Sequence, residues 1–230
     1  MKKTFSLAAA AALFAGAAAA APLSPVTYSM INGDGQASFG SFNYWDINYD
    51  GVGAVSGAGP KTSDGEFLSG GAGDLTDGYI ETQHWNTPGI ENTAGTGPYV
   101  GWYLDSPVIT FDFGTDVVID EVTLHYDSGA TGGVNAPASF SFGVQGGTPF
   151  SSGTLSNVAG PTSTTLTALN AAGSLFEMTI VSSGSWTFVS EVTFQGYVIG
   201  GTADVPVPAA APLLLGALGA MGIAARRRRG

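Results

Sequence analysis

The chain has 230 residues, with 35 glycines, no cysteine and a formal net charge of −11 at pH 7. Of its seven Lys and Arg residues only Lys61 lies between residues 22 and 204, where it faces all 18 acids, so this stretch has a net charge near −17. Binding to nucleic acid or to an anionic membrane surface needs clusters of Lys and Arg, and the composition excludes both. Neutral glycans, divalent cations and surfaces that do not repel a negatively charged protein remain as candidate partners.

The first segment, residues 1–21, predicts a signal peptide. Lys2 and Lys3 precede an apolar run that ends in alanines before Pro22, which is the pattern of an exported chain, with cleavage expected near Ala21. A buried apolar helix is the disfavoured alternative, because the charge is confined to the extreme N-terminus. Secreted domains often contain disulfides, and this one has no cysteine. Its stability must therefore come from packing, hydrogen bonds and any bound metal.

The last segment, residues 205–230, predicts a processed membrane tail. A Pro-rich break precedes a 17-residue uncharged run, which is at the short end of what spans a bilayer, and then four arginines that hold their end in the cytoplasm. A plain single-span anchor is the alternative. The order of motif, span and Arg cluster resembles the VPLPA-type PEP-CTERM sorting signals. The residues that carry the resemblance are Val205, Pro206, Pro208, Ala209, Arg226, Arg227, Arg228 and Arg229.

That resemblance implies recognition by an exosortase-type membrane enzyme, removal of the tail, and delivery to the cell surface or extracellular matrix. The chain would be anchored in the membrane only transiently, through its C-terminus. Proteins with this tail are associated with exopolysaccharide and biofilm.

The body, residues 22–204, predicts one all-β domain. Apolar residues alternate with polar ones in short runs bounded by Gly, Pro, Asn and Ser, and no long segment has helical periodicity. Such a pattern favours an antiparallel sandwich or barrel. The alternating apolar sets are Ile109, Phe111 and Phe113; Val122, Leu124 and Tyr126; Phe140, Phe142 and Val144; Phe176, Met178 and Ile180; and Val192 and Phe194.

The order of these runs resembles the discoidin, or factor V/VIII C-type, group of galactose-binding-like domains over residues 73–197. The pieces are "LTDG…TQHW", "YVGWYL", "PVITFDFG", "VVIDEVTLHY", "APASFSFGVQ" and "SEVTFQG". The resemblance implies a jelly-roll β-sandwich. Three departures stand out: Glu177 where Arg is common, a longer stretch at residues 99–112, and a Gly-Gly-Val insertion near residue 132.

The same resemblance implies a structural Ca²⁺, held by the carbonyl of Leu75 and by Asp77, Thr82 and Glu191. Ca²⁺ takes six to eight hard oxygens, many of them from loop carbonyls, and one ion would tie the first loop to the last strand. The alternative is that Asp77-Gly78 is a turn and Glu191 a solvated strand residue. A second motif, from Asp46 to Gly51, matches the start of an EF-hand loop. Its twelfth position is Gly57, so an Asp-Gly turn is favoured there.

Aromatic and imidazole side chains near the predicted strand ends are possible sugar contacts, because sugars pair apolar faces with hydrogen-bonding edges. These residues are His84, Tyr99, Trp102 and His125. The alternative is that Trp85 and Trp102 pack inside the sandwich. The body contains no Arg, which counts against a standard galactose site.

Catalysis has little support in the sequence. The chain has no thiol, no HExxH pattern, no G-x-S-x-G elbow and no phosphate loop. Paired carboxylates for glycoside hydrolysis stay open. We therefore expect an exported, non-catalytic surface or matrix protein that binds extracellular polysaccharide and is stabilised by Ca²⁺. The alternatives are a purely structural surface or biofilm protein without a specific ligand, and a polysaccharide-active enzyme.

Overall fold

The computed structural model describes residues 20–35, 43–53, 66–90, 97–129 and 131–200. The predicted sorting signal lies outside these residues, as does the predicted signal peptide apart from its last two positions. Among the described residues, no helix is long and apolar enough to cross a membrane.

The described residues form ten strands, all paired antiparallel. In chain order they are β1 (Ala21–Leu23), β2 (Thr27–Ile31), β3 (Phe67–Gly71), β4 (Val100–Tyr103), β5 (Val108–Asp127), β6 (Ser139–Val144), β7 (Phe150–Ser151), β8 (Pro161–Leu166), β9 (Ala171–Val181) and β10 (Trp186–Val198). A single 3-10 turn, η1 (Thr131–Gly133), precedes β6. The expectation of an all-β antiparallel sandwich is confirmed.

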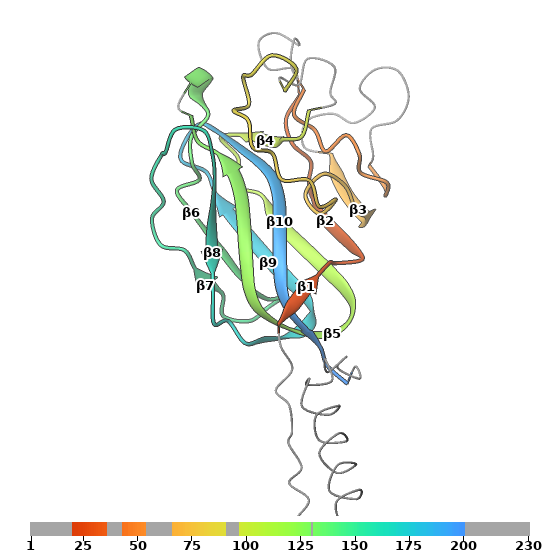
Figure 1. Cartoon of the computed structure of the whole chain (residues 1–230). Coiled ribbons are helices and arrows are strands. Elements are labelled where there is room, and N and C mark those ends of the chain that lie inside the picture. The colour runs from red at the N-terminus through yellow and green to blue at the C-terminus, as the bar shows by residue number, and fades with distance from the viewer. Residues whose placement is uncertain (1–19, 36–42, 54–65, 91–96, 130, 201–230) are drawn as a thin grey trace, which may run out of the picture. The chain divides into compact units, whose positions relative to one another are not determined.

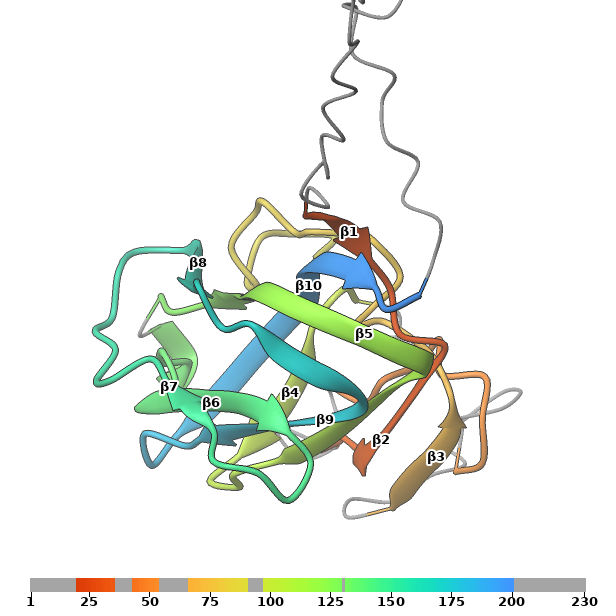
Figure 2. The same cartoon turned by 90° about the horizontal axis from the view of Figure 1, so that it is seen from below.

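Two layers share the long strand β5 (Figure 1). Its first half lies in a layer ordered β3-β2-β5-β9-β6-β7. Its second half lies between β8 and β10 in the other layer, where β4 and β1 pair with the far edge of β10. Seen from below, β1 and β10 lie on one side of the sandwich and β6, β9, β2 and β3 on the other (Figure 2).

The change of layer occurs inside β5 around residues 113–117. Pairing with β9 shifts register between Asp112 and Val117, residues 114–116 are exposed, and Gly114 has a φ of 67°, a conformation that suits glycine. The sequence predicts two strands here, because the apolar alternation stops at these residues. The structure has one strand with a bulged corner, which is how strands pass from one sheet to the next.

The core lies between the layers and consists of the predicted apolar faces. Ile109, Phe111 and Phe113 on β5 are at most 6% exposed. The Phe111 ring centroid lies 5.0 Å from that of Phe194 on β10, in an edge-to-face arrangement that aromatic rings prefer. The inner faces of the two layers therefore meet directly. The outward side chains of the two layers must then point to opposite sides of the molecule, because successive strand residues alternate between faces.

Candidate functional site

The predicted cation ligands come partly together at one end of β10. The N–H of Gly78 donates to Oε2 of Glu191 at 3.1 Å. The carbonyl of Leu75 accepts from the N–H of Val192 at 2.8 Å. Asp77 lies close enough to Glu191 for its carboxylate to influence the pKa there. Two hydrogen bonds, one to the predicted ligand Glu191 and one to the predicted ligand Leu75, thus fasten the loop after β3 to β10, and Asp77 lies beside them.

The carboxyl group of Glu191 is almost fully buried, with 3% of the residue exposed. Burial, together with the neighbouring carboxylates of Asp77 and Asp74, raises its pKa to about 8, although the hydrogen bond from Gly78 opposes the shift. The described residues contain no Lys or Arg. Glu191 therefore lies among negative charges with no Lys or Arg in the described chain to balance it, an environment that favours either a proton or a bound cation.

The residues around Asp77 and Glu191 could hold a hard cation only if oxygen atoms other than carboxylate oxygens also bind it. Among the described residues, no three His, Cys, Asp or Glu side chains are grouped so that they could hold a metal. The hydroxyl of Thr76, however, is buried without a hydrogen-bond partner, and it lines the same groove as Asp77 and Glu191. Two carboxylates, this hydroxyl and loop carbonyls are the oxygen types that Ca²⁺ binds.

Thr82, the fourth predicted ligand, takes no part in this grouping. It is exposed, its N–H donates to Oε1 of Glu81 at 2.7 Å, and it does not line the groove beside Asp77 and Glu191. A cation between Asp77 and Glu191 would therefore use Thr76 rather than Thr82 as its hydroxyl ligand. The sequence did not single out Thr76, because a threonine next to an Asp-Gly turn has no distinctive pattern.

The groove itself, called here the β10 groove, runs along the outer face of β5 and β10 and has a volume of about 490 Å³. The outward side chains of the two strands form its floor. Thr123 lies opposite Thr193, and His125 lies opposite Glu191. One wall is the segment from Pro22 to Pro25, and the other is the loop from Thr76 to Ile80.

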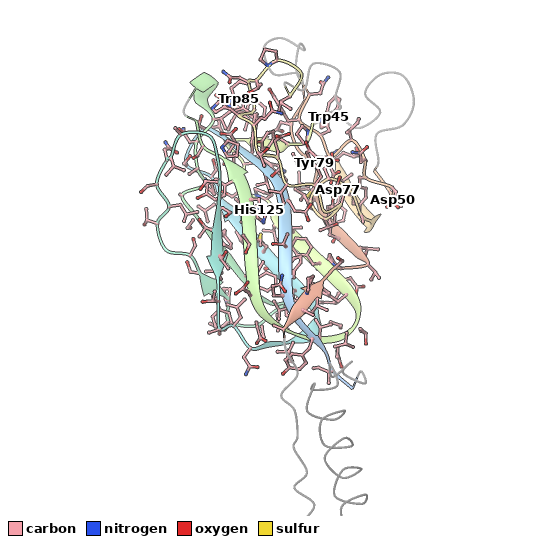
Figure 3. All side chains as sticks on the ribbon, viewed as in Figure 1. Trp45, Asp50, Asp77, Tyr79, Trp85 and His125 are labelled. Atoms are coloured by element: carbon pink, nitrogen blue, oxygen red, sulfur yellow. The ribbon has the colours of Figure 1, made fainter. Side chains whose placement is uncertain are left out.

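His125 lies within this groove, on the sheet face (Figure 3). Its Nε2 is 3.3 Å from the hydroxyl of Thr193. Burial lowers the pKa of His125, so the ring is neutral at pH 7 and can act as both donor and acceptor. Of the four predicted sugar contacts, His125 is the one that lines a groove beside the cation ligands.

Tyr99 and Trp102 are core residues, each 1% exposed. The Trp102 indole N–H donates to the carbonyl of Ile31 at 3.1 Å, and the Tyr99 hydroxyl donates to the carbonyl of Gln83 at 2.9 Å. Burial and the nearby Asp127 carboxylate raise the pKa of Tyr99. Neither ring presents a face to solvent on which a sugar could stack. The alternative that Trp102 packs inside the sandwich fits its position.

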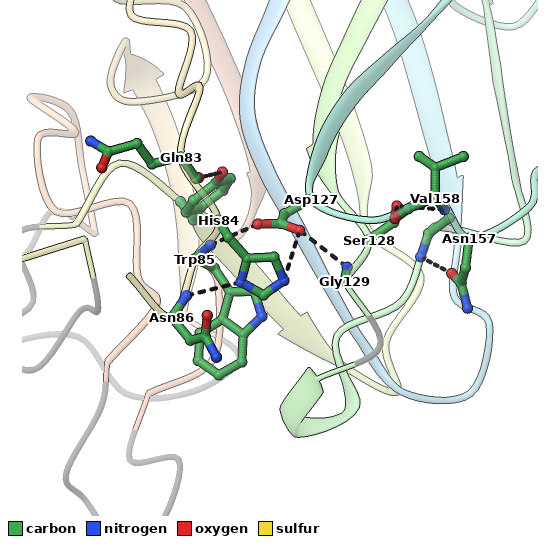
Figure 4. Close-up of polar contacts among 11 residues, drawn as sticks. Gln83, His84, Trp85, Asn86, Asp127, Ser128, Gly129, Asn157 and Val158 are labelled. Carbon is green, nitrogen blue, oxygen red and sulfur yellow. Dashed lines mark hydrogen bonds and ion pairs between the residues drawn. The ribbon is translucent and has the colours of Figure 1, made fainter. Parts of the chain in front are cut away.

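His84 belongs to a separate polar cluster around Asp127 (Figure 4). Asp127 is fully buried at the end of β5. Its Oδ2 accepts from the N–H of Trp85 at 2.7 Å, its Oδ1 accepts from the N–H of Gly129 at 3.1 Å, and His84 Nε2 lies 3.7 Å from Oδ1. The cluster joins the 83–85 loop to β5, which gives His84 a structural role.

The EF-hand-like motif also has a structural role. Oδ1 of Asp46 accepts from the N–H of Asp74 at 2.9 Å, the amide of Asn48 donates to Asp74 at 2.5 Å, and Oδ1 of Asp50 accepts from the N–H of Ala72 at 2.8 Å. All three motif side chains thus bind the 72–74 segment, through its backbone N–H groups or the Asp74 carboxylate. The favoured interpretation of this stretch as a turn rather than a metal loop fits these contacts.

No family model matches the chain, and no curated protein matches it. Solved structures do. One is the C-terminal domain of a chitobiase from Bacteroides fragilis, with 16% identity, 77% of this chain and 99% of that one covered, and a TM-score of 0.40. Another is the family 32 carbohydrate-binding module of NanJ from C. perfringens in complex with galactose, with 9% identity, 73% and 98% coverage, and a TM-score of 0.36.

A third is SpGH29, with 13% identity, 54% of this chain covered and a TM-score of 0.34; the chain spans 23% of the length of that protein. These identities and scores are low, and the ligand of this chain has to be argued from its own residues.

Proposed function

We propose that this chain is an exported, non-catalytic protein that binds neutral extracellular polysaccharide in the β10 groove, with Ca²⁺ held between Asp77 and Glu191. The observation that carries the proposal is the groove itself. Hydroxyl, amide and imidazole groups from β5 and β10 converge in one open channel of about 490 Å³, and Leu23 and Ile80 contribute apolar surface to its two walls.

The chemistry of the groove suits sugar rings. Thr123, Thr193, Gln195 and neutral His125 supply donors and acceptors that match sugar hydroxyls. Leu23 and Ile80 supply apolar surface for the C–H faces of a sugar, and Ile80 is 42% exposed. Combining apolar surface with a few convergent polar groups is the general form of a ligand site.

The charge of the chain narrows the ligand class. The described residues contain 15 acids and no Lys or Arg, so a uronate or sulfated glycan would meet no compensating base and would be repelled. A polysaccharide without carboxylate or sulfate groups meets no such penalty.

Calcium in this proposal has a structural role. It would neutralise the carboxylates of Asp77 and Glu191 and fasten the loop after β3 to the last strand. A ligand that binds only the folded state stabilises that state by mass action. The bound ion would in this way stabilise a chain that has no cysteine and therefore no disulfide. Oxygens from Asp77, Glu191 and Thr76, with the Leu75 carbonyl nearby, would hold the ion.

The two terminal segments support export and sorting. The predicted signal peptide directs secretion, and the VPLPA-like tail directs the chain to an exosortase-type enzyme and then to the cell surface or matrix. A matrix location would place the protein next to its proposed ligand. Comparing the mass of the secreted protein with that of the full chain tests both processing steps, and an unprocessed N-terminus or tail would contradict them.

One observation favours a second candidate, a polysaccharide-active enzyme. Glu191 and His125 are cross-strand partners in the β10 groove, and perturbed carboxyl groups in clefts are found at catalytic sites. Release of reducing ends from a neutral polysaccharide, abolished in Glu191→Gln, would establish that activity. A purely structural protein, the other alternative, predicts self-association and no saturable sugar binding.

The proposed function is tested by affinity electrophoresis through gels that contain agarose, hydroxyethylcellulose or glycol chitin. We expect retardation by at least one neutral polysaccharide in calcium buffer, and a clear loss of retardation in His125→Ala. Binding only to alginate, or equal migration in all gels, would overturn the proposal.

A further inference from the structure

A second groove lies on the opposite face of the sandwich. It has a volume of about 470 Å³ and is formed by β2, the start of β5, the first residue of β3, the β4–β5 connection and the buried Trp102 of β4. Ser29 and Ile31 point outward from β2, on the face away from the buried side chain of Met30. We call it the β2 groove. Because the inner faces of the two layers meet at Phe111 and Phe194, this groove and the β10 groove face in opposite directions.

The β2 groove combines exposed apolar side chains with hydroxyls. Phe67 is 55% exposed, Val108 is 45% exposed and Ile31 is 39% exposed. Ser29 lies directly opposite Thr110 in the antiparallel register, so two hydroxyls lie beside this apolar surface. An exposed aromatic ring next to hydroxyls is the arrangement that a sugar needs, with C–H groups against the ring and O–H groups on polar partners.

Charge decides among the possible occupants of this groove. Asp105 is a carboxylate in its lining, and the described chain holds no Lys or Arg with which to attract an anion. A second copy of the chain would bring an equally negative surface, with a formal net charge of −11, and like charges oppose close approach. An uncharged polymer rich in hydroxyls meets neither obstacle.

We propose that the β2 groove binds a second stretch of neutral polysaccharide, so that one molecule bridges two polysaccharide chains. This inference rests on the proposed function, because it assumes that the β10 groove binds the first. Two sites on opposite faces cannot engage one rigid segment together, so their joint effect is cross-linking rather than tighter binding to one segment.

A bridging assay tests the proposal with the full chain in mild detergent. The protein is first bound to agarose, insoluble chitin or cellulose, and the washed solid is then offered fluorescent soluble oligosaccharides of the same sugar. Wild type should retain the oligosaccharide. Phe67→Ala and Val108→Ser should bind the solid as wild type does but capture at least tenfold less oligosaccharide. Phe150→Ala is the matched control, because Phe150 is also an exposed strand phenylalanine, on β7 at the other edge of the same layer.

Each outcome bears on the proposal. Loss of capture in both groove variants, with binding to the solid and the melting temperature unchanged, supports it. Capture that persists in Phe67→Ala and Val108→Ser overturns it, as does a wild type that binds the solid but captures nothing; the proposed function survives both results. A wild type that binds none of the three solids overturns both proposals together.

Discussion

The backbone N–H of Gly78 donates to Oε2 of Glu191 at 3.1 Å, joining a loop to a strand 113 residues later. This contact holds the loop after β3 against β10, where the loop forms one wall of the β10 groove. The Asp77 carboxylate raises the pKa of the buried carboxyl group that accepts this hydrogen bond. The proposed calcium site and the proposed sugar groove therefore share this contact.

Calcium should raise the melting temperature of the wild type, and EDTA should lower it again. Glu191→Gln removes one carboxylate oxygen from the proposed site, so the calcium-dependent shift should fall to near zero. Glu177→Gln, the same change on the outer face of β9, should keep the full shift. Differential scanning calorimetry with and without calcium makes the comparison, and a shift that survives in Glu191→Gln would contradict the assignment.

Asp46 should make the protein less stable as the pH rises from about 4 to about 7. Burial, together with the Asp74 carboxylate, raises its pKa to about 7. Between the unfolded and folded pKa values the folded state holds the extra proton, so the free energy of unfolding falls by up to about 1.4 kcal/mol per pH unit.

Asp46→Asn mimics the protonated carboxyl group, which hydrogen-bonds Tyr28. Urea denaturation of this variant should therefore show a flatter pH dependence than wild type across the same window. The measurement is best made in EDTA, which removes any contribution from calcium. Parallel profiles for the two proteins would show that Asp46 is not the group responsible.

Sugar binding should weaken about fivefold in His125→Ala and in Thr193→Val, because each change removes a hydrogen-bonding group worth about 1 kcal/mol from the β10 groove. Thr165→Val is the control: Thr165 belongs to β8 on the same sheet face and bonds Thr123, yet it does not line the groove. Titration with the polysaccharide that retards the wild type gives the affinities. Equal losses in all three variants would point to a general change in the sheet.

Asp127→Ala should destabilise the fold by about 3 kcal/mol without a direct effect on the β10 groove. The change leaves the N–H groups of Trp85 and Gly129 without their acceptor, and an unsatisfied buried donor costs about 1–3 kcal/mol. Asp116→Ala, at an exposed position in the β5 corner, should change stability by less than about 0.5 kcal/mol. Urea unfolding measures both, and similar losses would contradict the role given to Asp127.

Much of the fold could be predicted, because period-2 alternation follows directly from strand geometry. Phe140 and Phe142, or Phe176 and Met178, are buried as that alternation predicts. Strand β8 was missed, since PTSTTL has little apolar alternation and pairs only with β5. The continuity of β5 was missed as well, because the exposed corner at residues 114–116 looks like a turn when only the sequence is read.

The candidate site could be predicted only in part. The resemblance to discoidin-like domains implied Asp77 and Glu191 as cation ligands, which stays a prediction, and nothing local marks Thr76, Thr193 or Gln195 as groove residues. These residues line the groove because β5 pairs with β10. That pairing joins strands far apart in the sequence, so a local sequence pattern does not reveal it. The sequence predicts Tyr99 and Trp102 as sugar contacts, but both side chains are buried. Aromatic residues near predicted strand ends can lie on either face of a sheet, so their position in the sequence does not determine their exposure.

The most direct test of the central claim is the migration of the full chain through polysaccharide gels, compared between wild type and His125→Ala in calcium buffer. The account predicts that at least one neutral polysaccharide retards the wild type, that His125→Ala migrates faster in the same gel, and that alginate retards neither. Unretarded wild type in every neutral gel, with a cooperative melting transition showing that it is folded, would contradict the account.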